Sequence, residues 1–159
     1  MSGRAGDLEG FLYRHIPLAR AMGVRVVAAD GDGVVLEAPL DVNDNHHGTL
    51  FGGSASALAM LSAWGWMHLR LEAEGLDPDL VIQRSAMDFV APGRADVTAR
   101  CPGTGERSWR RFLRTYRRFG RARLELPAVV SSGGEVVATL EGRFVALDPG
   151  NAQRWPPPG

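Results

Sequence analysis

Two spacings of apolar residues divide the chain into strands and helices. In residues 95–101, apolar and polar side chains alternate, and in residues 121–130 every second side chain from Ala122 to Val130 is apolar. Such alternation predicts antiparallel strands with one face in a core. Further strands are predicted over 24–29, 34–39, 80–91 and 135–147, and the segment Asp-Gly-Asp-Gly between the first two is typical of a hairpin turn.

Helical spacing predicts three helices. Residues 8–21 fit a short amphipathic helix that Pro17 ends or kinks. The longest predicted helix follows the loop at 43–54, runs to about residue 74 and is closed by Gly75. From Ala55 to Met67 nearly every residue is apolar or small, so other elements must enclose this helix. A third helix over 106–118 has arginines on most of its surface and four larger apolar residues at helical spacing: Trp109, Phe112, Leu113 and Tyr116.

The order of these elements predicts an α+β fold. Consecutive strands are joined by tight turns, so the sheet should be mainly antiparallel and should curve around the apolar helix. We expect a single domain over residues 8–147, a disordered lead-in over 1–7 and a flexible tail over 148–159. Pro127 indicates a sheet edge or a bulge within its strand.

Composition narrows the possible partners. Lys+Arg and Asp+Glu each number 18, and this balance argues against nucleic acid as the main partner. Cys101 is the only cysteine and is expected to be a small buried hydrophobe. The apolar run 55–67 is shorter than the roughly 18 residues of a membrane span. Asp7 and Glu9 precede the first apolar run, so we expect no secretory signal and a cytoplasmic protein. The sequence contains no cluster of metal-ligating residues, and we expect neither a metal nor a cofactor.

The segment 43–54 is a polar, glycine-rich loop that runs into the apolar helix. Consecutive glycines at a helix start expose N–H groups without an intrahelical partner, where the helix dipole favours negative charge. A substrate carbonyl directed at Gly52 or Gly53 would have its developing oxyanion stabilised by about 3 kcal/mol per donor. Asn45 could orient the attacking water or the carbonyl, and His47 could act as general base.

The same residues also have purely structural interpretations. A glycine pair before a helix is often only a turn. His46 and His47 can be polar loop residues that hydrogen-bond near the helix start. Asn43 and Asp44 can hold the loop through bonds from side chain to backbone.

These residues resemble the hot-dog fold thioesterases over nearly the whole chain. Segment 45–53 is similar to the Asn-x-x-Gly-x-x-His-Gly-Gly signature of the phenylacetyl-CoA type, with Phe51 in place of the histidine. The fuller segment 43–54, with 16–18 and 64–66, is closer to the YiiD C-terminal type. The resemblance implies a curved sheet around a central helix and an acyl-CoA or acyl carrier protein substrate, as in fatty acid metabolism. It also implies a homodimer or a dimer of dimers, a homotetramer, with the site shared between subunits.

The sequence departs from the family pattern at the catalytic acid. In the phenylacetyl-CoA type, a carboxylate one to two turns into the helix activates water. The matching position is Met60, and no acid occurs between Asp44 and Glu72. Asp88 interrupts an otherwise core-like strand and could reach the Asn45 loop of a partner subunit, or could simply face outward.

The candidate site residues fall into two sets. The expected catalytic residues are Asn45, His47, Gly52, Gly53 and Asp88. The expected substrate contacts are Asn43, His46, Phe51, Ser54, Ser62, Arg110 and Arg114. A helix serine such as Ser62 most often satisfies a local carbonyl. The six arginines from 107 to 118 are either a solvated face or a binding site for the phosphates of coenzyme A or for an acidic carrier protein. Nucleic acid is a third possible partner, but no aromatic residues accompany the arginines in a spacing suited to stacking.

Two other functions stay open beside thioester hydrolysis. A non-hydrolytic acyl-binding protein would hold a thioester that the missing acid leaves intact. A dehydratase of the same fold would require a histidine and a carboxylate, for which His47 and Asp88 are the candidates. Release of free thiol distinguishes a hydrolase from a binding protein, and a product still attached to its carrier indicates a dehydratase.

Overall fold

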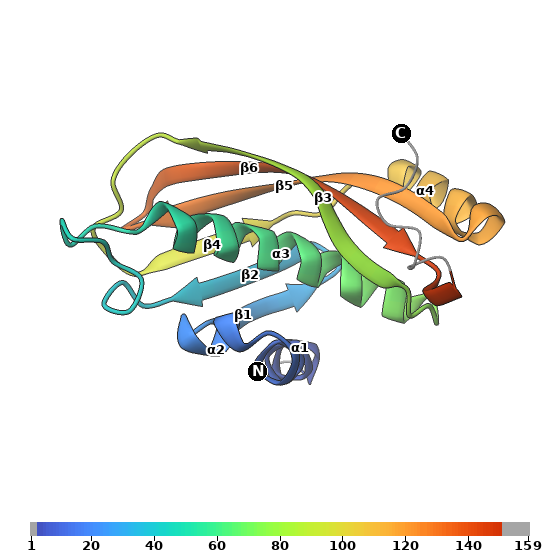
Figure 1. Ribbon diagram of the computed structural model, residues 1–159, viewed down its shortest axis with the longest axis horizontal. Helices are drawn as coiled ribbons and strands as arrows, with labels where there is room; N and C mark the ends of the chain where they lie inside the picture. The colour runs from blue at the N-terminus through green and yellow to red at the C-terminus, as the bar shows by residue number, and fades with distance from the viewer. Residues whose placement is uncertain (1–2, 151–159) are drawn as a thin grey trace.

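The computed structural model describes residues 3–150 and shows one curved sheet with a long helix lying across one of its faces (Figure 1). The helices are α1 (Gly3–His15), α2 (Pro17–Ala21), α3 (Gly52–Ala73) and α4 (Glu106–Phe119). The strands are β1 (Arg25–Asp30), β2 (Gly33–Ala38), β3 (Asp79–Phe89), β4 (Val97–Cys101), β5 (Arg121–Ser132) and β6 (Glu135–Leu147).

The six strands form one sheet in the order β1-β2-β4-β5-β6-β3, and every neighbouring pair is antiparallel. The hairpins β1–β2 and β5–β6 are those that the sequence predicts. The predicted fold class, an antiparallel sheet around a long central helix, is therefore confirmed.

Strand alternation determines which face of the sheet forms the core. In β5, every second side chain is buried from Ala122 to Val130, and the same face continues across β6. Pro127 lies beyond the part of β5 that pairs with β4, which begins at Val129, so it is at a local edge of the sheet. Cys101 is fully buried, and burial raises the pKa of its thiol to about 11, so the thiol stays protonated at neutral pH.

The sheet of this chain encloses α3 on one side only. Leu58, Trp66 and Met67 are buried in the core, as the apolar sequence of α3 requires. Met60 and Trp64 are half-buried on a stripe of α3 that no other part of the described chain covers completely. The prediction that α3 is enclosed all round is thus met only in part within one chain.

The two edges of the sheet are treated differently. Along β1, the edge is covered by α1: the Glu9 carboxylate accepts the N–H of Val26 at 2.9 Å, and the Tyr13 hydroxyl donates to the carbonyl of Val24 at 2.7 Å. The opposite edge is β3, 11 residues long. Within residues 3–150, no strand pairs with its outer side.

The N-terminal region differs from the prediction. Residues 3–7, expected as a disordered lead-in, belong to α1, because Ala5 joins Leu8 and Leu12 on a buried helical face. Glycines at positions 3, 6 and 10 lower the helix propensity and concealed this start in the sequence. The break at Pro17 is confirmed, since α1 ends at His15 and α2 begins at the proline.

Residues 148–150 of the predicted tail are exposed, although the N–H of Asp148 donates to the carbonyl of Gly120 at 2.7 Å. The rest of that predicted tail, with its run of three prolines, lies outside the described residues. No helix in the described part of the chain has the length and apolar character needed to cross a membrane.

Candidate functional site

The loop that enters α3 is anchored by Asn43, which is 2% exposed. Its Nδ2 donates to the carbonyls of Met22 and Pro39, both at 2.8 Å, while its own carbonyl accepts the N–H of Phe51 at 2.8 Å. Asn43 therefore ties the start of α3 to the end of α2 and the end of β2. The structure places this expected substrate contact in the interior, as an anchor of the loop.

Asn45 closes the tip of the loop. Its Oδ1 accepts the N–H groups of His47 at 2.9 Å and Thr49 at 3.3 Å, and its Nδ2 lies 3.0 Å from Thr49 Oγ1. The Asn45 N–H also donates to the Thr49 carbonyl at 2.8 Å. The side-chain amide is thus engaged in the loop, and contact with a substrate would require it to share or exchange these bonds.

His46 and His47 lie at the exposed tip of the same loop, with ring centroids 3.9 Å apart. Neither imidazole hydrogen-bonds to another group among the described residues. Both rings are therefore accessible to a bound substrate, and no neighbouring group selects their tautomer.

The first turn of α3 carries unpaired donors. The N–H groups of Gly52, Gly53 and Ser54 have no hydrogen-bond partner in residues 3–150, and the N-cap residue Phe51 provides no side-chain cap. These donors lie at the positive end of a helix of 22 residues. The arrangement is suited to receive an anion or a carbonyl oxygen that gains negative charge.

Two phenyl rings flank the glycine pair. A Cβ atom at Gly53 would collide with the ring of Phe51, and one at Gly52 would come within 3.3 Å of the ring of Phe89. The rings are 54% and 58% exposed, respectively. The donors are therefore bordered by an apolar wall, and a side chain at Gly52 or Gly53 would displace the ring next to it.

Phe89 and Gly93 belong to this site, although sequence reasoning did not identify them. Gly93 accepts the N–H of Leu50 at 2.8 Å, and a Cβ atom at Gly93 would lie 2.9 Å from the Leu50 Cβ. Phe89 reaches the loop from the last position of β3, and Gly93 reaches it from the turn that follows the strand. Only the Pro-Gly turn at 92–93 marked this segment in the sequence, and a turn signal does not reveal which distant loop it contacts.

The structure does not bring Asp88 to the glycine pair of its own chain. Asp88 pairs with Thr139, on the face of the sheet opposite to α3, whereas Met87 and Phe89 face α3. A β-bulge at Gln83 explains this orientation, because one extra residue reverses the face of every later side chain in the strand. The outward-facing interpretation is the one that the register supports.

The two candidate serines differ in access. Ser62 is fully buried and its hydroxyl donates to the carbonyl of Ala59 at 2.7 Å, so it lies in the core and away from any substrate. Ser54 is half-buried in the first turn of α3, next to the unpaired donors. Met60 lies on the half-buried stripe two turns further along.

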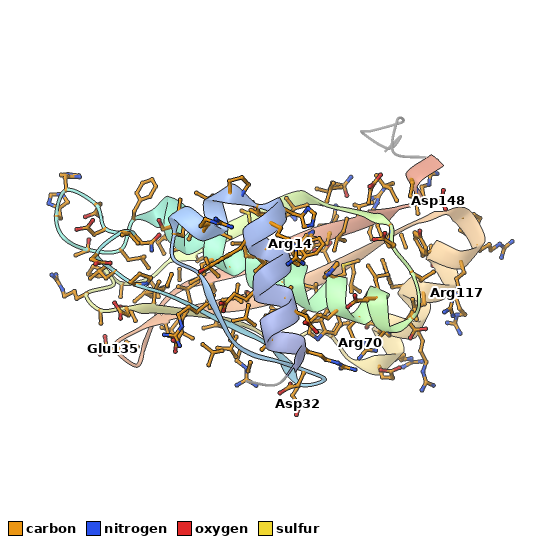
Figure 2. The ribbon with its side chains drawn as sticks, turned by 90° about the horizontal axis from the view of Figure 1, so that it is seen from below. Arg14, Asp32, Arg70, Arg117, Glu135 and Asp148 are labelled. Carbon is orange, nitrogen blue, oxygen red and sulfur yellow. The ribbon has the colours of Figure 1, made fainter. Side chains whose placement is uncertain are left out.

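Arg110 and Arg114 lie at the other end of α3. The helix α4 that carries them packs beside the C-terminal turns of α3, where Arg70 pairs with Glu106 at 3.0 Å and Arg117 with Glu74 at 2.9 Å. Figure 2 labels Arg70 and Arg117 at this end of the molecule.

Arg110 and Arg114 lie far from the glycine pair, because the length of α3 separates them. From Gly52 to Arg70 the helix axis spans about 27 Å. Arg110 is in addition occupied by Glu106 at 3.3 Å. Within one chain, these two expected substrate contacts are therefore not part of the site at the start of α3.

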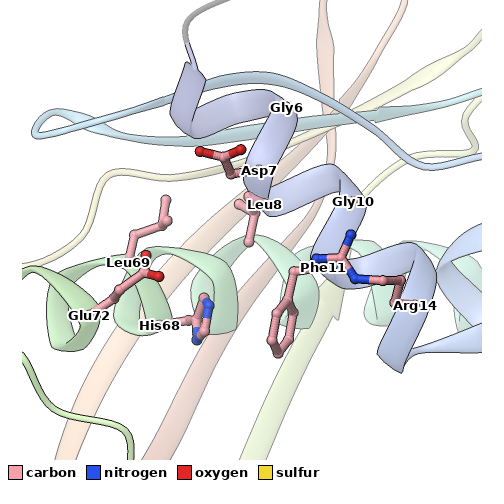
Figure 3. Close-up of a pocket in the computed structure, with 9 residues that line it drawn as sticks. All are labelled: Gly6, Asp7, Leu8, Gly10, Phe11, Arg14, His68, Leu69 and Glu72. Carbon is pink, nitrogen blue, oxygen red and sulfur yellow. The ribbon is translucent and has the colours of Figure 1, made fainter.

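A separate hollow of about 310 Å³ lies between α1 and α3 (Figure 3). Asp7, Arg14, His68 and Glu72 supply its polar lining, and it contains none of the predicted site residues. Burial lowers the pKa of His68, and the nearby Glu72 carboxylate opposes that shift. In the part of the chain that the structure describes, no group of three or more His, Cys, Asp or Glu side chains is arranged to hold a metal.

An antiparallel sheet curved around one long helix is the architecture of the hot-dog class of proteins. The family described as "Putative thioesterase (yiiD_Cterm)" matches residues 5–148, and the chain belongs to this family. The predicted family resemblance is thereby confirmed.

Solved structures agree with this assignment. A protein of unknown function from Chlorobaculum tepidum is 27% identical, with a TM-score of 0.87 over 91% of this chain and 94% of that one. A "putative thioesterase" from Shewanella oneidensis is 21% identical, with a TM-score of 0.82 over 92% of this chain and 99% of that one. A thioesterase from Haemophilus influenzae is 15% identical, with a TM-score of 0.69 over 91% and 90% of the two chains. The last two similarities concern the fold alone.

Proposed function

We propose that this protein hydrolyses acyl thioesters at the N-terminus of α3. The observation that carries the proposal is the set of unpaired N–H groups at Gly52, Gly53 and Ser54, at the positive end of the central helix of a thioesterase-family chain. The chemistry requires this arrangement because attack on a thioester carbonyl places a negative charge on its oxygen.

In the proposed reaction, the thioester oxygen accepts hydrogen bonds from the N–H groups of Gly52 and Gly53. Water attacks the carbonyl carbon and gives up a proton, and the tetrahedral intermediate collapses by breaking the bond from carbon to sulfur. The thiolate leaves and takes up a proton, so that the products are a carboxylic acid and a free thiol. Each donor that meets the oxyanion contributes about 3 kcal/mol.

His47 is the proposed proton acceptor for the attacking water. It is exposed, it lies on the loop that leads into α3, and its main chain is held by Asn45. Histidine is the residue type that most often fills this role. The orientation of Asp88 away from α3 favours His47 over that carboxylate within one chain.

The apolar wall beside the donors favours a substrate whose acyl group has a hydrocarbon chain next to the carbonyl. Phe51 and Phe89 border the donors and leave half of each ring exposed. An apolar acyl chain would cover these rings and exclude water from the oxyanion.

We further propose a homodimer formed through β3. An unpaired edge strand of 11 residues can pair with a second copy of itself, and the half-buried stripe of α3 that includes Met60 and Trp64 lies next to this edge. Trp64 reaches the edge strand directly, with its Nε1 donating to the Leu80 carbonyl at 3.2 Å. A partner on this edge would cover the side of α3 that one chain leaves open.

One observation favours a second candidate function. The first four turns of α3 contain no carboxylate, and a methionine, Met60, stands where the phenylacetyl-CoA type has its acid. A protein with the donors and the apolar wall but without an effective base would bind an acyl thioester and leave it intact.

Thiol release from a panel of short, medium, long and aromatic acyl-CoA thioesters distinguishes the two functions. Hydrolysis that peaks at one chain length is the result expected for a thioesterase. Saturable binding of acyl-CoA with no thiol released from any member would establish the binding protein instead.

A further inference from the structure

Four arginines of α4 form a single row on its exposed side. They are Arg107, Arg111, Arg114 and Arg118, and their spacing of four, three and four residues keeps them within about 60° of the helix circumference. The row is about 17 Å long. It lies opposite the buried face of α4, which consists of Trp109, Phe112, Leu113 and Tyr116.

The row is distinct from the other two arginines of α4. Arg110 pairs with Glu106 and Arg117 pairs with Glu74, both to one side of the row. Hydrogen bonds from Arg70 and then Arg110 lower the pKa of Glu106, which is thus already occupied. Among residues 3–150, no carboxylate lies within ion-pair distance of any arginine in the row.

This arrangement does not stabilise the helix. Like charges three or four residues apart repel each other, and the row contains three such adjacent pairs. The buried face of α4 supplies the packing that holds the helix despite this repulsion. The position of the charges in one row therefore calls for an explanation outside the stability of the chain.

A groove of about 420 Å³ runs beside the row, between α4 and β5. Arg111, which belongs to the row, and Arg123 of β5 both line it, and Glu125 in its wall is occupied by Arg143. Hydroxyl groups of Thr104, Ser108 and Thr115 complete the polar lining. The groove thus extends the basic surface sideways from the ridge of α4.

We infer that the row and this groove dock the acidic surface of the carrier protein that bears the thioester, an inference that rests on the proposed function. A small anion contacts one or two guanidinium groups, whereas a straight row of four along a convex helix complements an extended acidic surface such as a helix. All 18 basic residues of the chain are arginine, so the spacing and not the residue type supports the inference.

Nucleic acid fits this surface less well. The larger aromatic side chains of α4 point into the core, and the exposed Phe119 lies under the guanidinium of Arg118, 5.0 Å from its ring centroid. The row therefore lacks a platform on which bases could stack.

A carrier protein docked on the row could present its acyl group to the glycine pair of the other subunit in the proposed dimer. In Figure 1, the first turn of α3 lies at one end of the molecule and the helix α4 lies at the other. Two β3 edges related by a two-fold axis pair antiparallel, which reverses one subunit relative to the other. In the proposed dimer, the row of one subunit and the glycine pair of its partner accordingly lie at the same end.

The test compares hydrolysis of one acyl group carried by an acyl carrier protein and by coenzyme A. The row variant replaces arginines 107, 111, 114 and 118 with glutamine. The control variant makes the same change in net charge at four exposed arginines outside α4 that form no ion pair within the described chain: Arg4, Arg14, Arg25 and Arg100.

We expect the row variant to lose about tenfold in kcat/KM for the acyl carrier protein, mainly through KM, and to retain its acyl-CoA activity. The control variant should keep both activities, and added salt should slow only carrier-dependent turnover by the unsubstituted protein. Equal activities of the row and control variants towards the carrier protein would overturn the inference. An equal loss with acyl-CoA would do the same.

The inference and the proposed function can fail separately. If the unsubstituted protein hydrolyses neither substrate, the proposed function fails, and calorimetric binding of the acyl carrier protein then tests the row alone. Weaker binding by the row variant than by the control would support the inference. Equal binding by the two variants, or tighter binding of a single-stranded oligonucleotide than of the carrier protein by the unsubstituted chain, would overturn it.

Discussion

The two ends of α3 differ in whether their backbone polar groups have hydrogen-bond partners. At the N-terminus, three backbone N–H groups are left without partners in the described chain, beside the exposed rings of Phe51 and Phe89. The loop that leads there is nevertheless firmly held, because Asn43 and Asn45 bind it from inside. Rigid support around unpaired donors is what a preorganised oxyanion site requires.

At the C-terminus, the carbonyls of Leu71 and Glu72 in the last turn have partners. Gly75 adopts a left-handed conformation with φ of 70° after the last turn, and its N–H donates to the Glu72 carbonyl at 2.9 Å. Ion pairs of Arg70 and Glu74 with α4 join the two helices. The contrast agrees with our proposal that the N-terminal end binds the substrate, while the ion pairs at the C-terminal end join α3 to α4.

Filling the open end should have the largest effect. We expect Gly53→Val to reduce thiol release by at least about 100-fold, because the side chain collides with the Phe51 ring and obstructs access to the donors. A matched control is Gly105→Val at the start of α4, where a Cβ atom meets nothing within 4 Å. Full activity of a folded Gly53→Val variant would remove the glycine pair from the mechanism.

Removing the anchor of the open end should cost stability. Asn43→Ala leaves the carbonyls of Met22 and Pro39 without their donor in a buried site, and we expect the free energy of unfolding to fall by about 2–3 kcal/mol. Urea unfolding followed by circular dichroism measures this change. A loss below about 0.5 kcal/mol, the range of ordinary surface substitutions, would show that Asn43 does not hold the loop.

Asn45 can be tested for a direct role in catalysis. We expect Asn45→Ala to lower kcat by about tenfold and to change KM less, since it removes an interaction made in the transition state. Thr49→Ala breaks the same loop contact from the other side. If both substitutions lower kcat equally, Asn45 acts by closing the loop, and if kcat is unchanged in Asn45→Ala, the residue has no part in the reaction.

The smallest predicted effect concerns His68, which lies in the C-terminal half of α3 and faces α1. Burial lowers the pKa of His68 below its ordinary value of 6.5, so the unfolded chain takes up this proton more readily than the folded one. The stability that neutral His68 supports is complete above pH 6.5 and is lost as the pH falls through the lower folded pKa.

Between about pH 7.5 and 5.5, the Tm of His68→Gln should therefore fall less steeply than that of the unsubstituted protein. The matched control is His46→Gln, which makes the same substitution at an exposed position on the loop before α3. An unaltered slope in His68→Gln would show that this histidine does not contribute to the acid sensitivity of the fold.

The predictability of these features from sequence depends on the range of the contacts involved. The helix α3 and the strand β5 were predicted because periodicity and turn residues are local signals. The family motif likewise identified the glycine pair before its unpaired donors could be observed. Local patterns were thus sufficient for the fold and for the position of the loop.

Features that depend on distant contacts were not predictable. The role of Asn43 follows from carbonyls of Met22 and Pro39 that the fold brings to it. The outward orientation of Asp88 depends on one extra residue at the bulge in β3, which alternation alone does not reveal. The division of the arginines of α4 into paired and unpaired sets likewise required the position of Glu74.

The central claim is that the N-terminus of α3 binds the carbonyl oxygen of the thioester. The most direct measurement is the carbonyl 13C signal of a bound acyl-CoA ketone analogue, in which a CH2 group replaces the sulfur so that no hydrolysis occurs. We predict a downfield shift relative to the free analogue in water, and its loss in Gly53→Val. An unshifted carbonyl signal in the saturated, unsubstituted protein would contradict the account.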